Sequence, residues 1–309
     1  MTAIGTTTRT NPADRSAGAS VGAPAGAPAD LLPGGRLLAA PSWVRPGTLA
    51  ENCAWLAGKV HEAGLLFLES RACLAYGDED LPPWLSSLPL RWHVHLPLDL
   101  PWAAGAGEAA GPERAAEICL ALMDKLDFLG VRRAVLHPPL RALAGGEAGE
   151  AGGPGGELCL RSLAVFTAAW RKAGLDTGDL LLENLPETAT LRDWHRLAEA
   201  VRLFSCSFCF DFGHFLLHTG DAAARPGQKA GWSVPDWLPG ILRDTKLFHC
   251  CSAAHRALTR LSAPERAMCG EICRQARFCS PADAVFMLEL FRWEDVEASL
   301  PLLRRWLEV

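Results

Sequence analysis

The chain of 309 residues is long enough to bury the core of one large domain. Apolar residues make up 49% and charged residues 21%, which is typical of a globular protein and excludes a disordered or fibrous one. The net charge of −5 argues against a strongly basic surface of the kind that binds nucleic acid.

Residues 1–35 are predicted to form a disordered tail before the folded domain. They are rich in Ala, Gly, Thr and Pro and lack the continuous apolar stretch of a signal peptide. No apolar run elsewhere approaches the roughly 18 residues that a membrane span needs. We therefore expect a cytoplasmic protein with no membrane partner and with one folded domain over residues 36–309.

Strand-like and helix-like segments alternate along the folded part. The first strand is weak and lies around residues 37–44, and the helix after it begins with a capping box of Thr48 and Glu51 and is expected to end at Gly64. Seven further short apolar runs are predicted to be strands, at residues 65–69, 91–96, 134–137, 180–184, 208–211, 245–249 and 285–289. Apolar residues at helical spacing predict further helices, at residues 113–129, 160–174, 190–201 and 296–307.

The number and order of these segments predict the fold class, which is α/β. Near-continuous apolar strand interiors are typical of a parallel sheet that helices cover. Eight repeats within about 270 residues match a single-domain (β/α)8 TIM barrel. A doubly wound open sheet is the alternative, but the Gly-rich turn that usually follows its first strand is missing from this sequence.

The eleven cysteines are predicted to be reduced. An odd number suits no closed disulfide framework, and many fall inside predicted strands and helices, where they serve as small core residues. Cys206 and Cys209 form a C-x-x-C pair, but no second pair of matching spacing completes a zinc ribbon. We interpret this pair as structural.

Ionisable residues end most of the predicted strands, although a buried apolar run has no physical need of them. They are His95, His137, Glu183, Asp211, His249 and Glu289, and His214 and His255 follow in the loops beyond two of these ends. In a barrel, the carboxyl ends of the strands are where active sites are built. Converging carboxylates and imidazoles hold divalent metals, and without a cation so many carboxylates would repel one another. His93 is expected to face away from His95.

This pattern resembles that of the xylose-isomerase-like superfamily of barrels, and the resemblance covers residues 36–309. The superfamily includes sugar isomerases and epimerases and the endonuclease IV phosphodiesterases, also called AP endonuclease family 2. The isomerases need four ligands, which correspond here to Glu183, Asp211, His249 and Glu289. The endonuclease branch adds a third metal site and two strand-end histidines, which correspond to His95 and His137.

The resemblance implies up to three metal sites. The ligand sets would be His95, His137 and Glu183 for the first; Glu183, Asp211, His249 and Glu289 for the second; and His214 and His255 for the third. The endonucleases place an Asp shortly before the last histidine, where this chain has Ala253 and Ala254, so the third site is short of a ligand. Zinc suits the His-rich ligation, and manganese suits the carboxylate-rich second site.

Paired cations favour hydrolysis of a phosphoester over isomerisation. The residues to which the resemblance gives a catalytic role are Glu183, Asp211, His249 and Glu289.

A narrower resemblance concerns the substrate. Residues 46–52, residues 64–69 and above all the run HVHLPLDLPW at residues 93–102 are similar to the cobamide-remodelling phosphodiesterases, a bacterial family of this superfamily. This resemblance implies hydrolysis of the nucleotide-loop phosphoester of cobamides, the corrinoid cofactors related to cobalamin. A corrin is a broad apolar plate with amide edges, and the residues expected to contact it are Trp102, Asn184, Trp232 and Trp237.

Three other interpretations of the sequence are open at this point. A sugar isomerase or epimerase would use one metal and a Lys or Glu base, and the direction of the Lys246 side chain decides whether this lysine can serve. DNA repair at abasic sites is disfavoured by the acidic charge. A non-catalytic corrinoid-binding barrel would account for the missing Asp before His255. No feature of the sequence indicates an oligomeric state.

Overall fold

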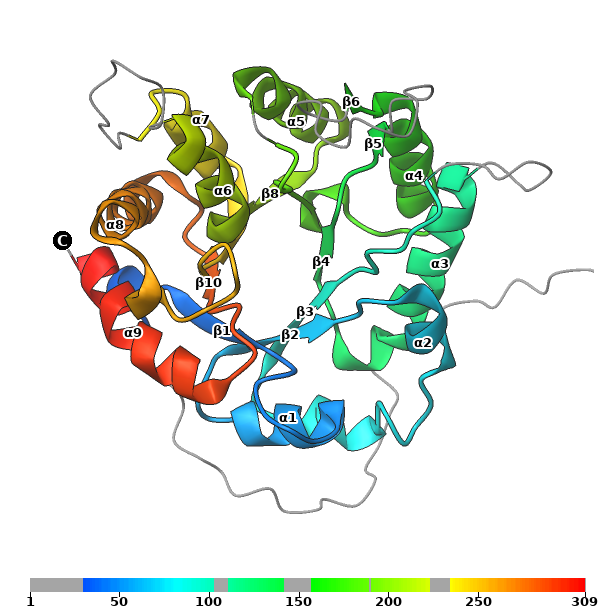
Figure 1. Cartoon of the computed structure of the whole chain (residues 1–309). Helices are drawn as coiled ribbons and strands as arrows, with labels where there is room; N and C mark the ends of the chain where they lie inside the picture. The colour runs from blue at the N-terminus through cyan, green and yellow to red at the C-terminus, as the bar shows by residue number, and fades with distance from the viewer. Residues whose placement is uncertain (1–29, 103–110, 142–156, 189, 223–233, 309) are drawn as a thin grey trace, which may run out of the picture.

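Eight parallel strands close into a barrel in the computed structural model, which describes residues 30–102, 111–141, 157–188, 190–222 and 234–308. Around the ring they follow the order β1 (Leu37–Pro41), β10 (Val285–Met287), β9 (Thr245–His249), β8 (Ser207–Asp211), β7 (Leu180–Glu183), β4 (Arg133–Leu136), β3 (Arg91–His95) and β2 (Glu62–Leu66) (Figure 1). Because β1 pairs with β10, the sheet has no free edge. The predicted (β/α)8 fold is confirmed, and the open doubly wound sheet is excluded.

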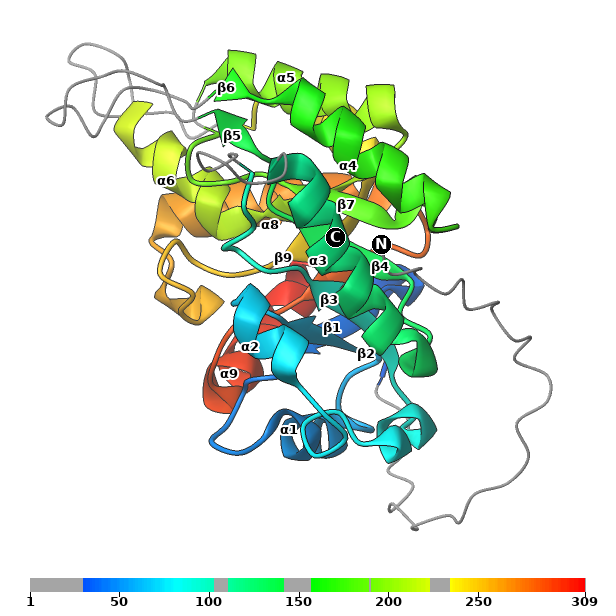
Figure 2. The same ribbon diagram turned by 90° about the vertical axis from the view of Figure 1, so that its right-hand side faces the viewer.

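Helices surround the barrel and cover the outer face of its strands (Figures 1 and 2). They are α1 (Leu49–Leu56), α2 (Ser70–Ala75), α3 (Gly111–Lys125), α4 (Leu160–Lys172), α5 (Leu191–Phe204), α6 (Phe212–Ala222), α7 (Leu238–Arg243), α8 (Ala263–Cys279) and α9 (Trp293–Glu308). A short antiparallel pair, β5 (Leu140–Arg141) and β6 (Glu157–Leu158), lies outside the barrel sheet.

A layer of apolar side chains fills the inside of the barrel. Residues two apart on a strand point to the same face, so every second residue faces the barrel axis. This layer consists of Leu37, Ala39, Leu66, Val135, Leu181, Cys209, Leu247, Val285 and Met287. The outward residues pack with the helices in a second, larger core. These residues show which positions of each strand point inward. On each strand, the inward position that follows them lies at the carboxyl end of the barrel, which we call the mouth.

The second strand lies earlier in the chain than predicted. Helix α1 begins with the predicted capping box of Thr48 and Glu51, but it ends at Leu56, and Gly64 lies inside β2. A Cβ at position 64 would lie 2.6 Å from His93 Nε2. The glycine therefore allows two neighbouring strands to pack closely and does not end a helix, as the sequence interpretation assumed.

Capping boxes fix the first turns of α1, α5 and α8. Their residues are Thr48 with Glu51, Thr190 with Asp193, and Ser262 with Glu265. The sequence prediction omits α8, although a Ser with a Glu three residues later is a signal for a helix start. It also omits α2, α6 and α7. Since α6 begins directly after β8, His214 lies in the first turn of a helix and not in a loop.

The described chain packs on the barrel from its first residues onward. Leu32 is buried, and Pro33–Gly35 form a 3₁₀ turn, whereas residues 1–29 of the predicted tail lie outside the described residues. Among the described helices, none is long and apolar enough to cross a membrane. All eleven cysteines are free thiols, and Cys206 and Cys209 are buried, in agreement with a structural role.

Candidate metal centre

The register of the barrel brings the six predicted strand-end ligands to the mouth. Each lies two positions beyond an inward-facing residue and therefore points toward the barrel axis. These pairs are His93 and His95, Val135 and His137, Leu181 and Glu183, Cys209 and Asp211, Leu247 and His249, and Met287 and Glu289. We call the six ligands the mouth cluster: His95, His137, Glu183, Asp211, His249 and Glu289. All of them except His137 are buried.

The expected direction of His93 is wrong. Residues two apart on a strand share a face, so His93 points into the barrel one layer below His95. Its Nδ1 lies 2.6 Å from Glu62 Oε1, and its Nε2 lies 3.3 Å from Met287 Sδ. His93 is therefore a member of the barrel interior with its own partners, and it does not belong to the mouth cluster.

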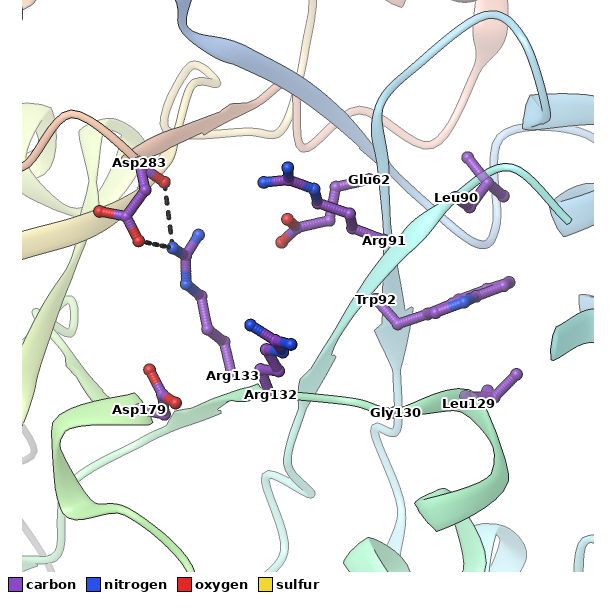
Figure 3. A pocket seen from close by; sticks show the side chains of 10 residues that line it. All are labelled: Glu62, Leu90, Arg91, Trp92, Leu129, Gly130, Arg132, Arg133, Asp179 and Asp283. Atoms are coloured by element: carbon purple, nitrogen blue, oxygen red, sulfur yellow. Dashed lines mark hydrogen bonds and ion pairs between the residues drawn. The ribbon is translucent and has the colours of Figure 1, made fainter. Parts of the chain in front are cut away.

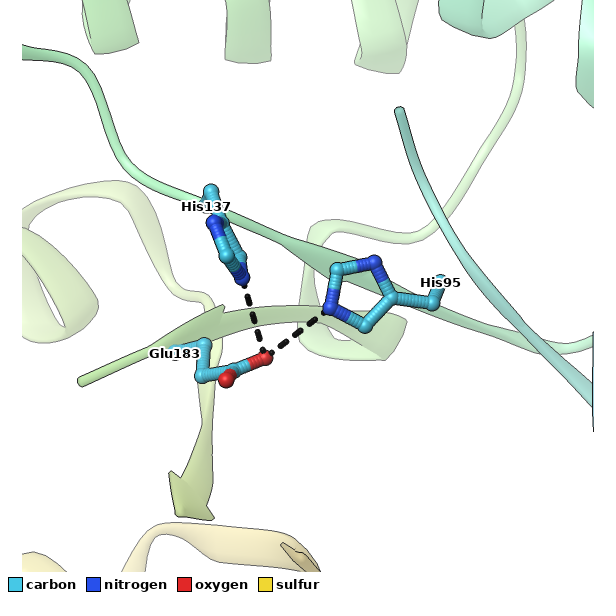
Figure 4. A group of neighbouring side chains, drawn as sticks. All are labelled: His95, His137 and Glu183. Atoms are coloured by element: carbon cyan, nitrogen blue, oxygen red, sulfur yellow. Dashed lines mark hydrogen bonds and ion pairs between the residues drawn. The ribbon is translucent and has the colours of Figure 1, made fainter. Parts of the chain in front are cut away.

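Glu183 lies at the centre of the mouth cluster. Its Oε2 is 3.2 Å from His95 Nε2 and 3.6 Å from His137 Nε2, and both rings point toward it (Figure 4). The same oxygen lies 3.6 Å from His249 Nδ1. Two of these three distances are longer than a hydrogen bond. The first predicted ligand set is thus brought together with spacing that leaves room for a cation between its atoms.

A backbone carbonyl fixes which nitrogen of His95 is available. Nδ1 lies 2.9 Å from the carbonyl oxygen of Leu96, and because that oxygen can only accept, Nδ1 carries the proton. Nε2, which lies 3.2 Å from Glu183 Oε2, is then the ring nitrogen that a metal would take. Donation of the second ring N–H to a carbonyl is a common way in which proteins orient a metal-binding histidine.

The second predicted ligand set surrounds His249. Its Nδ1 lies 3.4 Å from Glu289 Oε2, 3.6 Å from Glu183 Oε2 and 3.7 Å from Asp211 Oδ2. Both ring nitrogens are buried, and within the described structure neither has a hydrogen-bond partner. An unpaired buried polar group costs free energy, and a cation held by these residues would remove that cost. The donor set therefore fits a divalent metal.

Without a cation, the buried carboxylates of the mouth cluster repel one another. Burial raises the pKa of Glu289 well above its ordinary value, and the charges of Asp211 and Glu183 raise it further. Burial would also raise the pKa of Glu183, but His249 and His137 outweigh it and hold that pKa well below its ordinary value. Burial lowers the pKa of His249. A bound cation would allow all three carboxylates to be ionised.

Asn184 and His214 position the ends of β7 and β8. Asn184 Nδ2 donates to the carbonyl oxygen of Asp211 at 2.9 Å, and the amide of Asp211 donates to Asn184 Oδ1 at 2.8 Å. Because both polar atoms of this buried amide are engaged, Asn184 orients Asp211, and the predicted substrate contact is replaced by a positioning role. His214 Nδ1 lies 2.8 Å from the carbonyl oxygen of Asn184 and 3.3 Å from Glu183 Oε1.

His214 carries a raised pKa because of these neighbours. Burial would lower the pKa of His214, but its hydrogen bond to Glu183 and the charges of Asp211 and Glu183 raise it to about 9. The ring is therefore charged at neutral pH in the metal-free protein, with a proton on Nδ1.

The third predicted ligand pair lies side by side at the mouth. The ring centroids of His214 and His255 are 6.4 Å apart, and each ring also lies with other candidate ligands: His214 with Glu183 and Asp211, and His255 with Cys251 and Glu289. The sequence interpretation overlooks Cys251. The signal that could have revealed it is its spacing, because Cys251 continues the inward alternation of β9 beyond the end of the strand.

The predicted tryptophan contacts lie in the helical layer. Trp102 packs against Phe166 with ring centroids 5.5 Å apart, and Trp237 packs against Trp194 at 5.0 Å. Both indoles are half-buried by these contacts, so packing accounts for them. Trp232 lies outside the described residues.

Exposed apolar side chains line one side of the mouth. Trp43, Leu68, Leu98 and Phe291 follow the carboxyl ends of β1, β2, β3 and β10, which are neighbours in the barrel. Each is at least 37% exposed. The amide of Leu98 donates to the carbonyl of Leu68, and the ring of Phe291 lies 5.5 Å from that of His255. We call these four residues the apolar rim; exposed apolar surface beside convergent polar groups is typical of a ligand site.

The amino end of the barrel has a cavity of its own. Its volume is about 520 Å³, and Arg91, Arg132 and Arg133 point into it (Figure 3). Lys246 also reaches toward this end, where its Nζ donates to the carbonyl oxygen of Gly178 at 2.7 Å. Lys246 therefore points away from the mouth and cannot act as a base there. Barrels of this kind build their active sites at the opposite end, so the cavity is separate from the metal centre.

Comparison with known proteins finds the same fold in other solved structures. No protein-family model matches the chain, and no curated protein matches its sequence. Among solved structures it is similar to a D-tagatose 3-epimerase-like protein, with 14% identity, a TM-score of 0.58, and coverage of 88% of this chain and 97% of that one. It is similar to endonuclease IV from Thermus thermophilus, with 20% identity, a TM-score of 0.53, and coverage of 88% and 99%.

A third similar structure is that of the IOLI protein with a binding zinc atom, at 12% identity and a TM-score of 0.50, with coverage of 88% of this chain and 95% of that one. Identities this low establish the architecture alone. The chain thus shares the TIM-barrel fold of these solved structures.

Proposed function

We propose that the chain is a metal-dependent hydrolase of a phosphoester. One observation carries the proposal: Glu183 Oε2 is shared between two donor groups, with His95 and His137 on one side and His249 on the other. A carboxylate in that position can bridge two cations, whereas a four-ligand isomerase site has no use for the first two histidines. Divalent cations bound there would supply Lewis-acid activation of a phosphoryl oxygen and of a water molecule.

The residues of the mouth do the positioning that such a reaction needs. Hydrolysis adds one water across a P–O bond and yields a phosphate monoester and an alcohol. Glu183, Asp211 and Glu289 would hold the cations, and the carbonyl of Leu96 orients His95 so that its Nε2 faces Glu183. His214 Nδ1 lies 3.3 Å from Glu183 Oε1 and would help to orient that carboxylate.

For the substrate, we propose the nucleotide-loop phosphoester of a cobamide. The similarity of residues 93–102 to the cobamide-remodelling phosphodiesterases supports this choice. The apolar rim supports it independently, because a broad apolar plate can rest on Leu68, Leu98 and Phe291 while its phosphoester reaches the mouth cluster. Packing accounts for the half-buried Trp102 and Trp237, and Trp232 stays a predicted substrate contact.

The test is incubation of the purified protein with a cobamide, with Zn²⁺ or Mn²⁺ supplied and under reducing and non-reducing conditions. We expect release of the lower-ligand nucleoside or its phosphate, and loss of that release in Glu183→Gln. Absence of release under every metal condition would refute the cobamide proposal. If the same preparations hydrolyse a generic phosphodiester such as bis(p-nitrophenyl) phosphate but not the cobamide, the proposed reaction class stands and only the proposed substrate is rejected.

A ketose 3-epimerase is the second candidate, because several of the similar folds carry that activity in their names. Lys246 cannot be its base, so a glutamate would have to remove the proton next to the carbonyl. Glu289 is the candidate for that role, because it is a buried carboxylate at the mouth whose pKa is raised by burial and by the charges of Asp211 and Glu183.

Metal content and isotope exchange separate the two candidates. An epimerase binds one cation per chain and exchanges carbon-bound hydrogen of a ketohexose with D₂O. A phosphoester hydrolase binds two or more cations and leaves the ketohexose unlabelled.

A further inference from the structure

We propose that Cys251 is a metal ligand, and that together with His255 and Glu289 it forms a thiolate-containing zinc site at the mouth. The inference rests on the metal centre of the proposed function and deepens it, because it identifies the ligand that occupies the gap left by Ala253 and Ala254. It also selects zinc over manganese.

The position of Cys251 is the first argument. It follows His249 by two residues, so it continues the inward face of β9 into the loop beyond the strand. Its side chain is fully buried, and its Sγ lies 3.6 Å from Asp211 Oδ2. Ligand atoms of Cys251, His255 and Glu289 all lie within 4.8 Å of one another, close enough for small side-chain movements to bring the three donors onto one cation.

The loop is held so that the thiol keeps this position. A Cβ on Gly213 would lie 2.7 Å from the carbonyl oxygen of Ser252 and 3.1 Å from Cys251 Sγ, so only a glycine lets helix α6 approach this closely. His255 adopts a left-handed φ of 48°, a strained conformation for a residue with a side chain. That conformation turns its ring toward the mouth, where Nδ1 lies 3.5 Å from Glu289 Oε2.

An unpaired nitrogen is the independent observation that indicates a ligand. His255 Nδ1 is buried and, in the described part of the chain, has no hydrogen-bond partner. Cys251 meanwhile places its S–H against a carboxylate, a weak bond for a buried group to rely on. A cation between Sγ, the ring nitrogen and Glu289 would pair the orphaned nitrogen, and the thiol would release its proton to solvent as the metal–sulfur bond forms.

The chemistry of sulfur determines which metal is expected. Thiolate is a soft ligand that binds zinc well, whereas manganese prefers carboxylate and water oxygens. A site with Cys251 therefore favours Zn²⁺ even though the neighbouring carboxylates would accept Mn²⁺. The neighbouring Cys250 provides a matched control, since it is buried like Cys251 but belongs to none of the groups of potential metal ligands in the described structure.

The test is cobalt substitution followed by absorption spectroscopy. Protein stripped with a chelator is titrated with Co²⁺, and the sulfur-to-cobalt charge-transfer band is recorded in the near ultraviolet. We expect the band in the unmodified protein, its loss in Cys251→Ser, and its retention in Cys250→Ser. Cys251→Asp should bind the same number of cobalt ions without the band, and should lose selectivity for zinc over manganese by at least about tenfold.

Each result bears on a different claim. Cobalt bound without a charge-transfer band, or a band that persists in Cys251→Ser, overturns the thiolate site and leaves the proposed function intact. Failure to bind any cobalt overturns the metal centre itself. Circular dichroism of the stripped variants shows whether Cys251→Ser still folds, and Cys251→Asp tests the same ligand position if it does not.

Discussion

Each end of the barrel holds a buried histidine beside a buried glutamate, but the two pairs differ in whether their polar atoms are satisfied. At the amino end, His93 Nδ1 lies 2.6 Å from Glu62 Oε1, and the other ring nitrogen contacts a methionine sulfur. At the mouth, His249 lies 3.4 Å from Glu289, and neither of its nitrogens has a hydrogen bond in the described structure. A histidine–glutamate pair whose ring nitrogens all have partners stabilises a fold. A pair that leaves buried ring nitrogens without hydrogen bonds indicates a missing ligand.

The carboxylates of the two ends differ in the same way. Burial would raise the pKa of Glu62, but the hydrogen bond from His93 and the charges of His93, Arg133 and Arg91 outweigh it and lower that pKa. Glu289 has the opposite shift, because burial and the charges of Asp211 and Glu183 all raise its pKa. The repulsion among these carboxylates is a feature of the mouth, and a cation bound there would relieve it.

Replacing Glu183 by Gln should have the largest effect, because it removes the atom that both donor groups share. We expect activity to fall by roughly a thousandfold or more, which is about 4 kcal/mol of transition-state stabilisation. Metal content, measured by elemental analysis, should fall with it. Unchanged metal content in this variant would mean that the ligand assignment is wrong.

The matched change at the amino end is Glu62→Gln, which should destabilise the fold without touching the metal. Loss of a charged, buried hydrogen bond to His93 should cost about 2–3 kcal/mol of unfolding free energy in a denaturant titration. Metal content and activity at a temperature where the variant is folded should stay unchanged. A loss of bound metal would show that the two ends are not independent.

The pH dependence of the metal-free protein should sharpen the contrast. The folded pKa of His214, about 9, lies above its ordinary value of 6.5, so its contribution to stability is complete below pH 6.5 and is lost as the pH rises through about 9. The raised pKa of Glu289 acts in the same direction. We expect a loss of about 2 kcal/mol across this window in chelated protein, and a flatter profile in His214→Gln.

Asn184→Ala should have the smallest effect, since Asn184 acts on the metal through Asp211. Removing an outer partner of a ligand typically lowers metal affinity by roughly 10–100-fold, and we expect about tenfold here. Competition with a metal-sensitive dye measures this directly. The substrate KM should not change; an increase in KM at saturating metal would restore the substrate-binding role that the sequence indicated.

Much of the fold and of the mouth cluster could be predicted because both depend on alternation along strands. Apolar runs that end in Glu183, Asp211 or His249 identify a barrel strand and its ligand together. The direction expected for His93 was wrong because residues two apart on a strand share a face. The other differences concern features set by neighbours distant in sequence. Gly64 looks like a helix end until β3 is placed beside it, and the loop around Cys251 takes its shape from the close approach of α6 at Gly213.

The capping boxes give the mouth a modular organisation. Thr48, Thr190 and Ser262 each end a loop that follows a barrel strand, and these loops carry Trp43 of the apolar rim, the amide of Asn184, and the pair Cys251 and His255. Each of these helices has its first turn stabilised by its own capping box, at about 1 kcal/mol per cap. Substitutions within one loop therefore need not alter the structure of the next repeat of the barrel. A barrel with this organisation can change the side chains at its mouth one loop at a time while its strands remain the same.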